Sequence, residues 1–202
     1  MPGGGAQSDR RSGEHRTHHL TLASGSSQRS AILEQLGIAF EVVVPQIEEI
    51  GEGDPEALVR ENALRKAHAI DGARVLGVDT AVALDGRAFG KPRDEPEARA
   101  FLAALSGVTH EVWSGIALVE GSTERVEAAV TLVSFRSLGQ ADLDTYVATG
   151  EWRDHAGGYA IQGRGAALVE RIEGDYLNVV GLPVAELVRM APDLFRFAGR
   201  SR

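Results

Sequence analysis

A serine-rich loop near the start of the sequence has the composition of an anion-binding site. Ser24-Gly25-Ser26-Ser27-Gln28-Arg29 follows a short apolar run and precedes a segment with apolar residues at helical spacing. Backbone N–H groups and the dipole at the start of a helix attract phosphate, and the serine hydroxyls and Arg29 would add donors and charge. Capping of the helix by Ser26 or Ser27 is the alternative interpretation. The loop therefore predicts a phosphate site or a helix cap.

Carboxylates and two lysines supply the other groups that a polyphosphate site needs. Asp79 follows the apolar VLGV, where a charge is costly unless it is paired or binds a metal. Glu48-Glu49 lies in an acidic loop, and magnesium prefers few carboxylates together with phosphate oxygens and water. Only Lys66 and Lys91 are lysines among 21 basic residues, and a compact ammonium suits phosphate contacts. The alternatives are a structural hydrogen bond at Asp79, a solvated Glu pair and two surface lysines.

Several other kinds of site are excluded by spacing or by composition. Gly86–Lys91 resembles a Walker phosphate loop, but it is one residue short and Pro92 stands where Ser or Thr is required. Gly163-Arg-Gly165 lacks the third glycine of a dinucleotide site, and no G-x-S-x-G elbow or zinc-ligand pair of histidines occurs. The absence of cysteine excludes disulfides and thiol chemistry. A net charge of −8 argues against nucleic acid or anionic membrane as a partner.

Alternating strands and helices must position these residues. Apolar and β-branched runs predict strands, and amphipathic spacing with Gly, Pro or Asp at the ends predicts helices. The order of elements, with one long antiparallel pair, predicts a mixed sheet flanked by helices. We expect strands over 19–23, 40–45, 73–84, 110–120, 124–135 and 167–174, and helices over 30–37, 55–70, 96–105, 139–149 and 183–190.

Two local patterns make sharper predictions. Asp85-Gly86 is typical of a tight hairpin turn. In the strand over 124–135, apolar residues alternate with others, which predicts a half-buried antiparallel strand. The residues of its predicted apolar face are Val126, Ala128, Val130 and Leu132.

The chain divides into a tail and a body. Residues 1–19 are rich in Gly, Arg and His, which predicts a disordered extension, in which His15, His18 and His19 are solvated or bind a metal loosely. Residues 20–198 predict a single domain. No apolar run approaches the roughly 18 residues of a membrane span, and the N-terminus has no apolar stretch of a secretory signal. We therefore expect a cytoplasmic protein without a membrane partner.

The blocks LASGSSQRSAILEQLG, VLGVDTAV, AGGYAIQGRGA and EGDYLNVVGLP occur in this order over nearly the whole body. Together with further blocks they resemble the Maf nucleotide pyrophosphatases. This resemblance implies a mixed α/β sheet with two lobes around a cleft, related to the inosine triphosphatases. It also implies hydrolysis of nucleoside triphosphates between the α- and β-phosphates, with Mg²⁺ or Mn²⁺ as cofactor. A body with long antiparallel strands could pair as a homodimer. The blocks include LASGSSQRSAILEQLG, FEVV…IEE, RKA, VLGVDTAV, GKP, LSGVTHEVWSG, YVATGE, AGGYAIQGRGA and EGDYLNVVGLP.

The resemblance implies roles for the residues already singled out. Asp79 would be the catalytic residue, which activates water or holds the divalent ion, and Glu49 would help with the metal or the water. The remaining charged and hydroxyl groups would hold phosphate oxygens and neutralise developing charge. These phosphate-binding residues are Ser24, Ser26, Arg29, Lys66 and Lys91.

Thr80, Gln162 and Gln28 occupy the positions that set base specificity in the family. Thr80 and Gln162 resemble the branch that acts on dTTP, UTP and modified pyrimidine triphosphates, and an amide can both donate to and accept from a uracil edge. The chain departs from the family twice: Gln28 replaces an arginine, and His155 replaces a lysine. The alternatives are a pyrophosphatase of the 7-methyl-GTP type and a non-catalytic nucleotide-binding regulator of septum formation.

Overall fold

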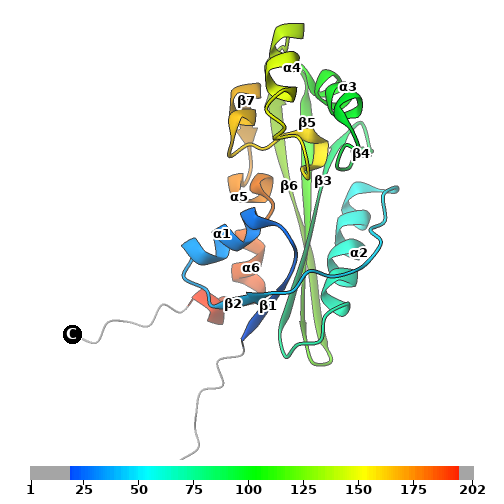
Figure 1. Ribbon diagram of the computed structural model, residues 1–202. Coiled ribbons are helices and arrows are strands. Elements are labelled where there is room, and N and C mark those ends of the chain that lie inside the picture. Colours follow the sequence, from blue (N-terminus) through cyan, green and yellow to red (C-terminus); the bar gives the residue numbers. More distant parts are fainter. Residues whose placement is uncertain (1–18, 196–202) are drawn as a thin grey trace, which may run out of the picture.

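A seven-stranded mixed sheet runs through the part of the protein that the computed structural model describes, residues 19–195 (Figure 1). Its strands are β1 (Leu20–Ala23), β2 (Phe40–Val42), β3 (Val75–Leu84), β4 (Arg87–Phe89), β5 (Thr109–Glu120), β6 (Thr123–Phe135) and β7 (Val169–Glu173). They are arranged in the order β2-β1-β3-β5-β6-β7, and β4 pairs with the end of β3. β1 is parallel to both neighbours, whereas the other pairs are antiparallel. The predicted mixed sheet is confirmed.

Helices cover both faces of this sheet. They are α1 (Ser27–Gln35), α2 (Pro55–His68), α3 (Glu95–Leu105), α4 (Gln140–Val147), α5 (Tyr176–Val180) and α6 (Val184–Met190), with short 3-10 turns η1 (Ala156–Gly158), η2 (Arg164–Leu168) and η3 (Pro192–Phe195). α2 lies on one side of the long strands, and α1, α5 and α6 lie on the other (Figure 1). Because side chains alternate along a strand, neighbouring residues of β3 face different helices.

Two apolar cores form at opposite ends of the long strands, which gives the predicted two lobes. One core joins α1 and α6 to β1 and the first half of β3, with Leu22, Leu33 and Leu187 fully buried. The other joins α3 and α4 to the far ends of β5 and β6, with Leu102 and Phe135 at its centre. β3, β5 and β6 pass through both lobes and fix one against the other.

Two glycines let α2 lie directly on the sheet backbone. A Cβ atom at Gly77 would sit 2.0 Å from the carbonyl oxygen of Ala63, and one at Gly115 would sit 2.1 Å from that of Val59. Real Cβ atoms do not approach so closely, so only glycine fits at either position. This contact sets the height of α2 above β3, and therefore the distance from the polar residues of α2 to Asp79.

The predicted antiparallel pairing of β6 is confirmed. Of its predicted apolar face, Val126 and Ala128 pack partly buried against apolar residues of α2 and the sheet, whereas the last third of the strand buries the opposite face. Val130 is 44% exposed, whereas Thr131 and Val133 on the opposite face are 1% and 0% exposed. Thr131 can be buried because its hydroxyl group accepts from Asn178 and donates to the carbonyl oxygen of Asp175. A satisfied hydroxyl therefore replaces an apolar side chain on the core side.

The remaining differences concern the ends of elements. α1 begins at Ser27, three residues before the predicted start, because Ser26 caps it. β2 ends at Val42 instead of residue 45, because Val42 forms the last pair with its partner strand β1. α5 was not predicted. Of the predicted extension, residues 1–18 lie outside the described residues. No helix within residues 19–195 is long and apolar enough to cross a membrane.

Candidate active site

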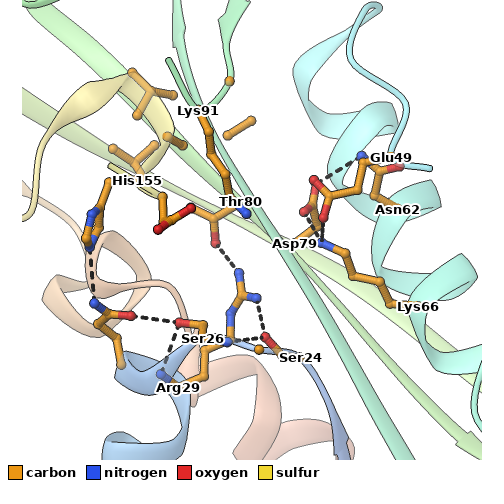
Figure 2. Close-up of a pocket in the computed structure, with 18 of the residues that line it drawn as sticks. Ser24, Ser26, Arg29, Glu49, Asn62, Lys66, Asp79, Thr80, Lys91 and His155 are labelled. Atoms are coloured by element: carbon orange, nitrogen blue, oxygen red, sulfur yellow. Dashed lines mark hydrogen bonds and ion pairs between the residues drawn. The ribbon is translucent and has the colours of Figure 1, made fainter. Parts of the chain in front are cut away.

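The residues predicted to do chemistry converge on one cleft of about 750 Å³ (Figure 2). Its walls come from the loop after β1, the loop before α2, the inner faces of α2 and β3, and the segment Arg153–Ala156. Glu48 does not line the cleft, and Gln162 lines an adjoining pocket of about 40 Å³. The predicted residues that do line it are Ser24, Ser26, Gln28, Arg29, Glu49, Lys66, Asp79, Thr80 and Lys91.

Lys66 joins the two carboxylates on one wall of the cleft. Its Nζ lies 2.5 Å from Asp79 Oδ1 and 2.8 Å from Glu49 Oε1. The side chains of Lys66 and Asp79 are each 8% exposed, whereas that of Glu49 is 44% exposed. A buried charge is costly unless it is paired, and Lys66 supplies that pairing for Asp79. The Glu49 carboxylate extends from this buried pair to the solvent.

Asn62 was not identified from the sequence, yet it completes this wall. Its Nδ2 donates to Asp79 Oδ2 at 3.1 Å and to the carbonyl oxygen of Ile50 at 2.9 Å, and its Oδ1 accepts from the Ile50 N–H at 2.8 Å. Asn62 therefore ties the loop that carries Glu49 to the carboxylate of Asp79. The available signal was its position four residues before Lys66, which places both side chains on one face of α2.

The charges in the cleft influence one another. Burial raises the pKa of Glu49, but the positive charge and hydrogen bond of Lys66, with the charges of Lys91 and Arg29, outweigh burial and hold that pKa below its ordinary value. Burial lowers the pKa of Arg29, and the negative charges of Asp79 and Glu49 oppose that change. Glu49 is therefore ionised and Arg29 remains charged at neutral pH.

The serine loop and Arg29 form the opposite wall. Ser26 caps α1, since its side chain accepts from the Arg29 N–H at 3.5 Å, which confirms the capping interpretation for this residue. Arg29 is 8% exposed, and its guanidinium group donates to Ser24 Oγ at 2.8 Å, to Thr80 Oγ1 at 3.0 Å and to the carbonyl oxygen of Gly181 at 2.8 Å. Arg29 therefore underlies the loop, and Ser24 and Ser26 lie above it at the start of α1.

Lys91 and Thr80 differ in how the fold holds them. Lys91 is exposed and follows β4, the second strand of a hairpin. The turn of this hairpin is Asp85-Gly86, as predicted, with positive φ angles of 51° and 75°. Thr80 lies inside β3, and its hydroxyl group contacts Arg29 and, at 3.0 Å, Ser114 Oγ. Lys91 can thus move toward a ligand, whereas Thr80 is fixed.

Gln28 contacts His155, so the two departures from the family pattern meet in space. Gln28 Nε2 lies 3.1 Å from His155 Nε2, although 127 positions separate the residues in the chain. Both line the cleft and the adjoining pocket that contains Gln162. The sequence predicted a role for Gln28 but gave no signal that His155 would be its partner.

The donor set fits a metal only in combination with a ligand. Within the part of the chain that the structure describes, no group of three or more His, Cys, Asp or Glu side chains could hold a metal ion. Asp79 and Glu49 offer two carboxylates that meet at Lys66. Mg²⁺ commonly binds one or two carboxylates and completes its shell with phosphate oxygens and water, and such an arrangement fits these two residues.

The chain is similar to known proteins over most of its length. A family model described as "Maf-like protein" matches residues 19–194. A dTTP/UTP pyrophosphatase of Symbiobacterium thermophilum is 48% identical over 177 residues, which cover 85% of this chain and 91% of that protein. A dTTP/UTP pyrophosphatase of Anaeromyxobacter sp. is 48% identical over 187 residues, 89% of each chain. Among solved structures, the Staphylococcus aureus Ham1 protein is similar with a TM-score of 0.40 and 15% identity, covering 58% of this chain and 71% of that one.

Proposed function

Since the chain belongs to the family of Maf-like proteins, we propose that it is a nucleoside triphosphate pyrophosphatase, which hydrolyses dTTP, UTP and modified pyrimidine triphosphates to the monophosphate and pyrophosphate. Its similarity to dTTP/UTP pyrophosphatases over most of their length supports this substrate class. The observation that carries the proposal is the pairing of Asp79 and Glu49 through Lys66, across one cleft from the serine loop. This arrangement supports a carboxylate base and a phosphate-binding loop on opposite sides of one substrate.

Asp79 is proposed to act as the general base. It accepts a proton from a water molecule as the water oxygen attacks the α-phosphorus, and the bond from that phosphorus to the bridging oxygen breaks, so that pyrophosphate leaves. The hydrogen bonds from Lys66 and Asn62 fix the orientation of the Asp79 carboxylate before the water arrives. Such fixed groups contribute to catalysis because they need little reorganisation during the reaction.

The opposite wall is proposed to hold the triphosphate. Ser24 and the N–H groups at the start of α1 donate to phosphate oxygens, and Ser26 joins them when its hydroxyl group turns from Gln28 Oε1 to the ligand. Lys91 approaches from the exposed rim. Arg29 supplies positive charge from beneath the loop, because its nitrogens already donate to Ser24, Thr80 and Gly181. Lys66 contributes a second buried charge next to Asp79. Together these groups offset the negative charge of the substrate in an otherwise acidic protein.

We propose Mg²⁺ or Mn²⁺ as the cofactor, held by Glu49 and Asp79 together with phosphate oxygens. When bound, the ion would neutralise charge on the phosphoryl oxygens. Both carboxylates contact Lys66, so the ammonium group must share them with the ion or move aside. Addition of EDTA should therefore abolish turnover, and re-addition of Mg²⁺ should restore it; turnover that persists in EDTA would contradict this proposal.

Base preference is proposed to depend on Thr80, Gln28 and Gln162. Gln28 and Gln162 line the small pocket beside the cleft, and each amide group can donate and accept. Thr80 helps to position the cleft wall through Arg29 and Ser114. This arrangement supports a pyrimidine base, whose edge offers both carbonyl and N–H groups.

A panel of nucleoside triphosphates tests the proposed function. The protein is incubated with UTP, dTTP, CTP, GTP and 7-methyl-GTP in the presence of Mg²⁺, and pyrophosphate and orthophosphate are measured separately. We expect pyrophosphate from UTP and dTTP at the highest kcat/KM. Orthophosphate without pyrophosphate would refute cleavage between the α- and β-phosphates, and preferred turnover of 7-methyl-GTP would refute the pyrimidine preference. Binding without turnover would favour a regulator.

We also propose that the protein acts in the cytoplasm as a homodimer. The long antiparallel pair β5–β6 leaves Val130 44% exposed on one face, which offers apolar surface to a second copy. Sedimentation equilibrium of the wild type and of Val130→Lys tests this assembly. A monomeric wild type, or a dimer that Val130→Lys leaves intact, would contradict a dimer through this face.

A further inference from the structure

Gln28 and His155 form a hydrogen-bonded pair between the main cleft and the small pocket beside it. Both side chains line both spaces, and their nitrogens are 3.1 Å apart. Gln28 belongs to the first turn of α1, and His155 precedes η1. The pair therefore connects two segments that are far apart in the chain, at the boundary between the two spaces.

The partners of each side chain determine the direction of this hydrogen bond. His155 Nδ1 lies 2.8 Å from the carbonyl oxygen of Arg153, which can only accept, so Nδ1 carries the proton and Nε2 of the neutral ring is an acceptor. Gln28 Oε1 accepts from Ser26 Oγ at 3.0 Å and from Ser27 Oγ at 3.3 Å, so its amide N–H points to His155. The pair thus presents one donor and one acceptor side by side.

The small pocket has the chemistry of a base site but lacks the room for a base. Its walls are apolar at Ile161, Val179 and Val180, and Gln162 adds an amide group. Its volume of about 40 Å³ holds roughly three water molecules, since one water needs about 10–15 Å³ of such space. A pyrimidine ring is larger than this, so its lining must move to admit a base, and separation of Gln28 and His155 would join the pocket to the main cleft.

We propose that His155 is a specificity-determining residue, and that the pyrimidine base of the substrate separates the Gln28–His155 pair and takes over its hydrogen bonds. The imide N–H of uracil or thymine would donate to His155 Nε2, and the Gln28 amide N–H would donate to an adjacent base carbonyl. One internal hydrogen bond is thereby replaced by two. This inference rests on the proposed function, because it assumes that the triphosphate lies in the main cleft.

Tripolyphosphate has no base, so its binding reports on the phosphate site alone and not on the Gln28–His155 pair. We compare the KM for UTP with the inhibition constant of tripolyphosphate for the wild type, His155→Ala and His155→Asn. We expect His155→Ala to raise the KM for UTP by roughly three- to tenfold, because the imide N–H of the bound base is left without an acceptor, without change in kcat or in tripolyphosphate inhibition. His155→Asn restores a carbonyl acceptor and should recover most of the loss. His68→Ala removes an imidazole far along α2 and should change neither constant.

Two results would overturn the inference. An equal rise in the UTP and tripolyphosphate constants would show that His155 acts on the phosphates or on the fold, and no rise in either would show that the pair only supports the loop. If the wild type does not hydrolyse UTP, the proposed function fails by itself. The dissociation constant of UMP, measured by calorimetry on the same proteins, then decides the inference, and the same ratio between variants is expected.

Discussion

The two ends of the cleft are built on different principles. At the proposed reacting end, Asp79 lies in the middle of β3 and Lys66 in the last turn of α2, and both are buried and ion-paired. At the base end, Gln28 and His155 lie at a helix start and in a Gly-rich connection, and a single neutral hydrogen bond joins them. Thus ion pairs fix the side chains where the phosphate bond would break, whereas a hydrogen bond that a ligand can replace joins the side chains where the base would bind. Substitutions at the reacting end should therefore affect kcat strongly, and those at the base end should affect KM modestly.

The largest effect is expected from Asp79→Asn. The amide keeps the shape and one hydrogen-bond acceptor but cannot take a proton, so kcat should fall by about a thousandfold, within the range of general-base catalysis. Steady-state pyrophosphate release from UTP measures this loss, and circular dichroism checks that the variant is folded. Asp71→Asn, at an exposed residue beyond the end of α2, is the matched control and should retain full activity. Substantial turnover by folded Asp79→Asn would refute the catalytic role.

The reacting end also depends on backbone packing that a single methyl group would disturb. Gly115→Ala places a Cβ atom 2.1 Å from the carbonyl oxygen of Val59, so α2 must lift from the sheet and move Lys66 away from Asp79. We expect a loss of about 1–3 kcal/mol in the free energy of unfolding, typical of overpacking, and a lower kcat. Urea denaturation measures the first quantity. Gly51→Ala, whose methyl group would meet no atom within 4 Å, should leave the stability unchanged. Equal stability of both variants would contradict this account of α2.

The sequence predicted the elements of the reacting end better than their packing. The mixed sheet, the long antiparallel pair and the individual residues Lys66, Asp79 and Glu49 follow from local patterns and residue types, but the ion pairs that join these three residues do not. The contact of Gly115 with α2 does not, because close approach of a helix is a tertiary property that a lone glycine does not reveal. The change of buried face along β6 has a related cause: both faces carry apolar residues from Val126 to Phe135, so alternation alone does not show where the core covers each face. Asn62 and the pairing of Gln28 with His155 depend on contacts between distant segments.

Acid should weaken the lobe beneath the base end. Burial lowers the pKa of His110 to about 4, and its Nε2 contacts the hydroxyl group of Tyr159, which lines the cleft and the small pocket. Below the ordinary pKa of 6.5, the unfolded chain binds a proton at His110 that the folded protein does not bind. The free energy of unfolding therefore decreases as the pH is lowered from about 6.5 to about 4. The loss attributable to His110 should be about 2 kcal/mol at pH 5.

Denaturation at pH 7 and pH 5 tests this dependence on pH. His110→Gln removes the titrating group and should flatten the difference between the two conditions, whatever its effect on stability at pH 7. His19→Gln, at an exposed histidine directly before β1, is the control and should keep the dependence of the wild type. A His110→Gln variant with the same loss between pH 7 and pH 5 as the wild type would assign the acid sensitivity to other groups.

The two lysines give the finest test of the contrast between fixed and movable groups. Lys66 Nζ contacts Asp79, Glu49 and the carbonyl oxygen of Val78 from a buried position, so a larger, planar guanidinium group cannot reproduce its geometry. Lys66→Arg should lower kcat/KM for UTP at least about tenfold, whereas Lys91→Arg on the exposed rim should stay within about threefold of the wild type, because an exposed side chain can adjust. Arginine supplies all but two of the 21 basic residues, so the sequence already accepts it at most cationic positions. If the two variants lose equal activity, burial does not decide how strictly lysine is required, and the distinction between the buried and exposed phosphate-site cations fails.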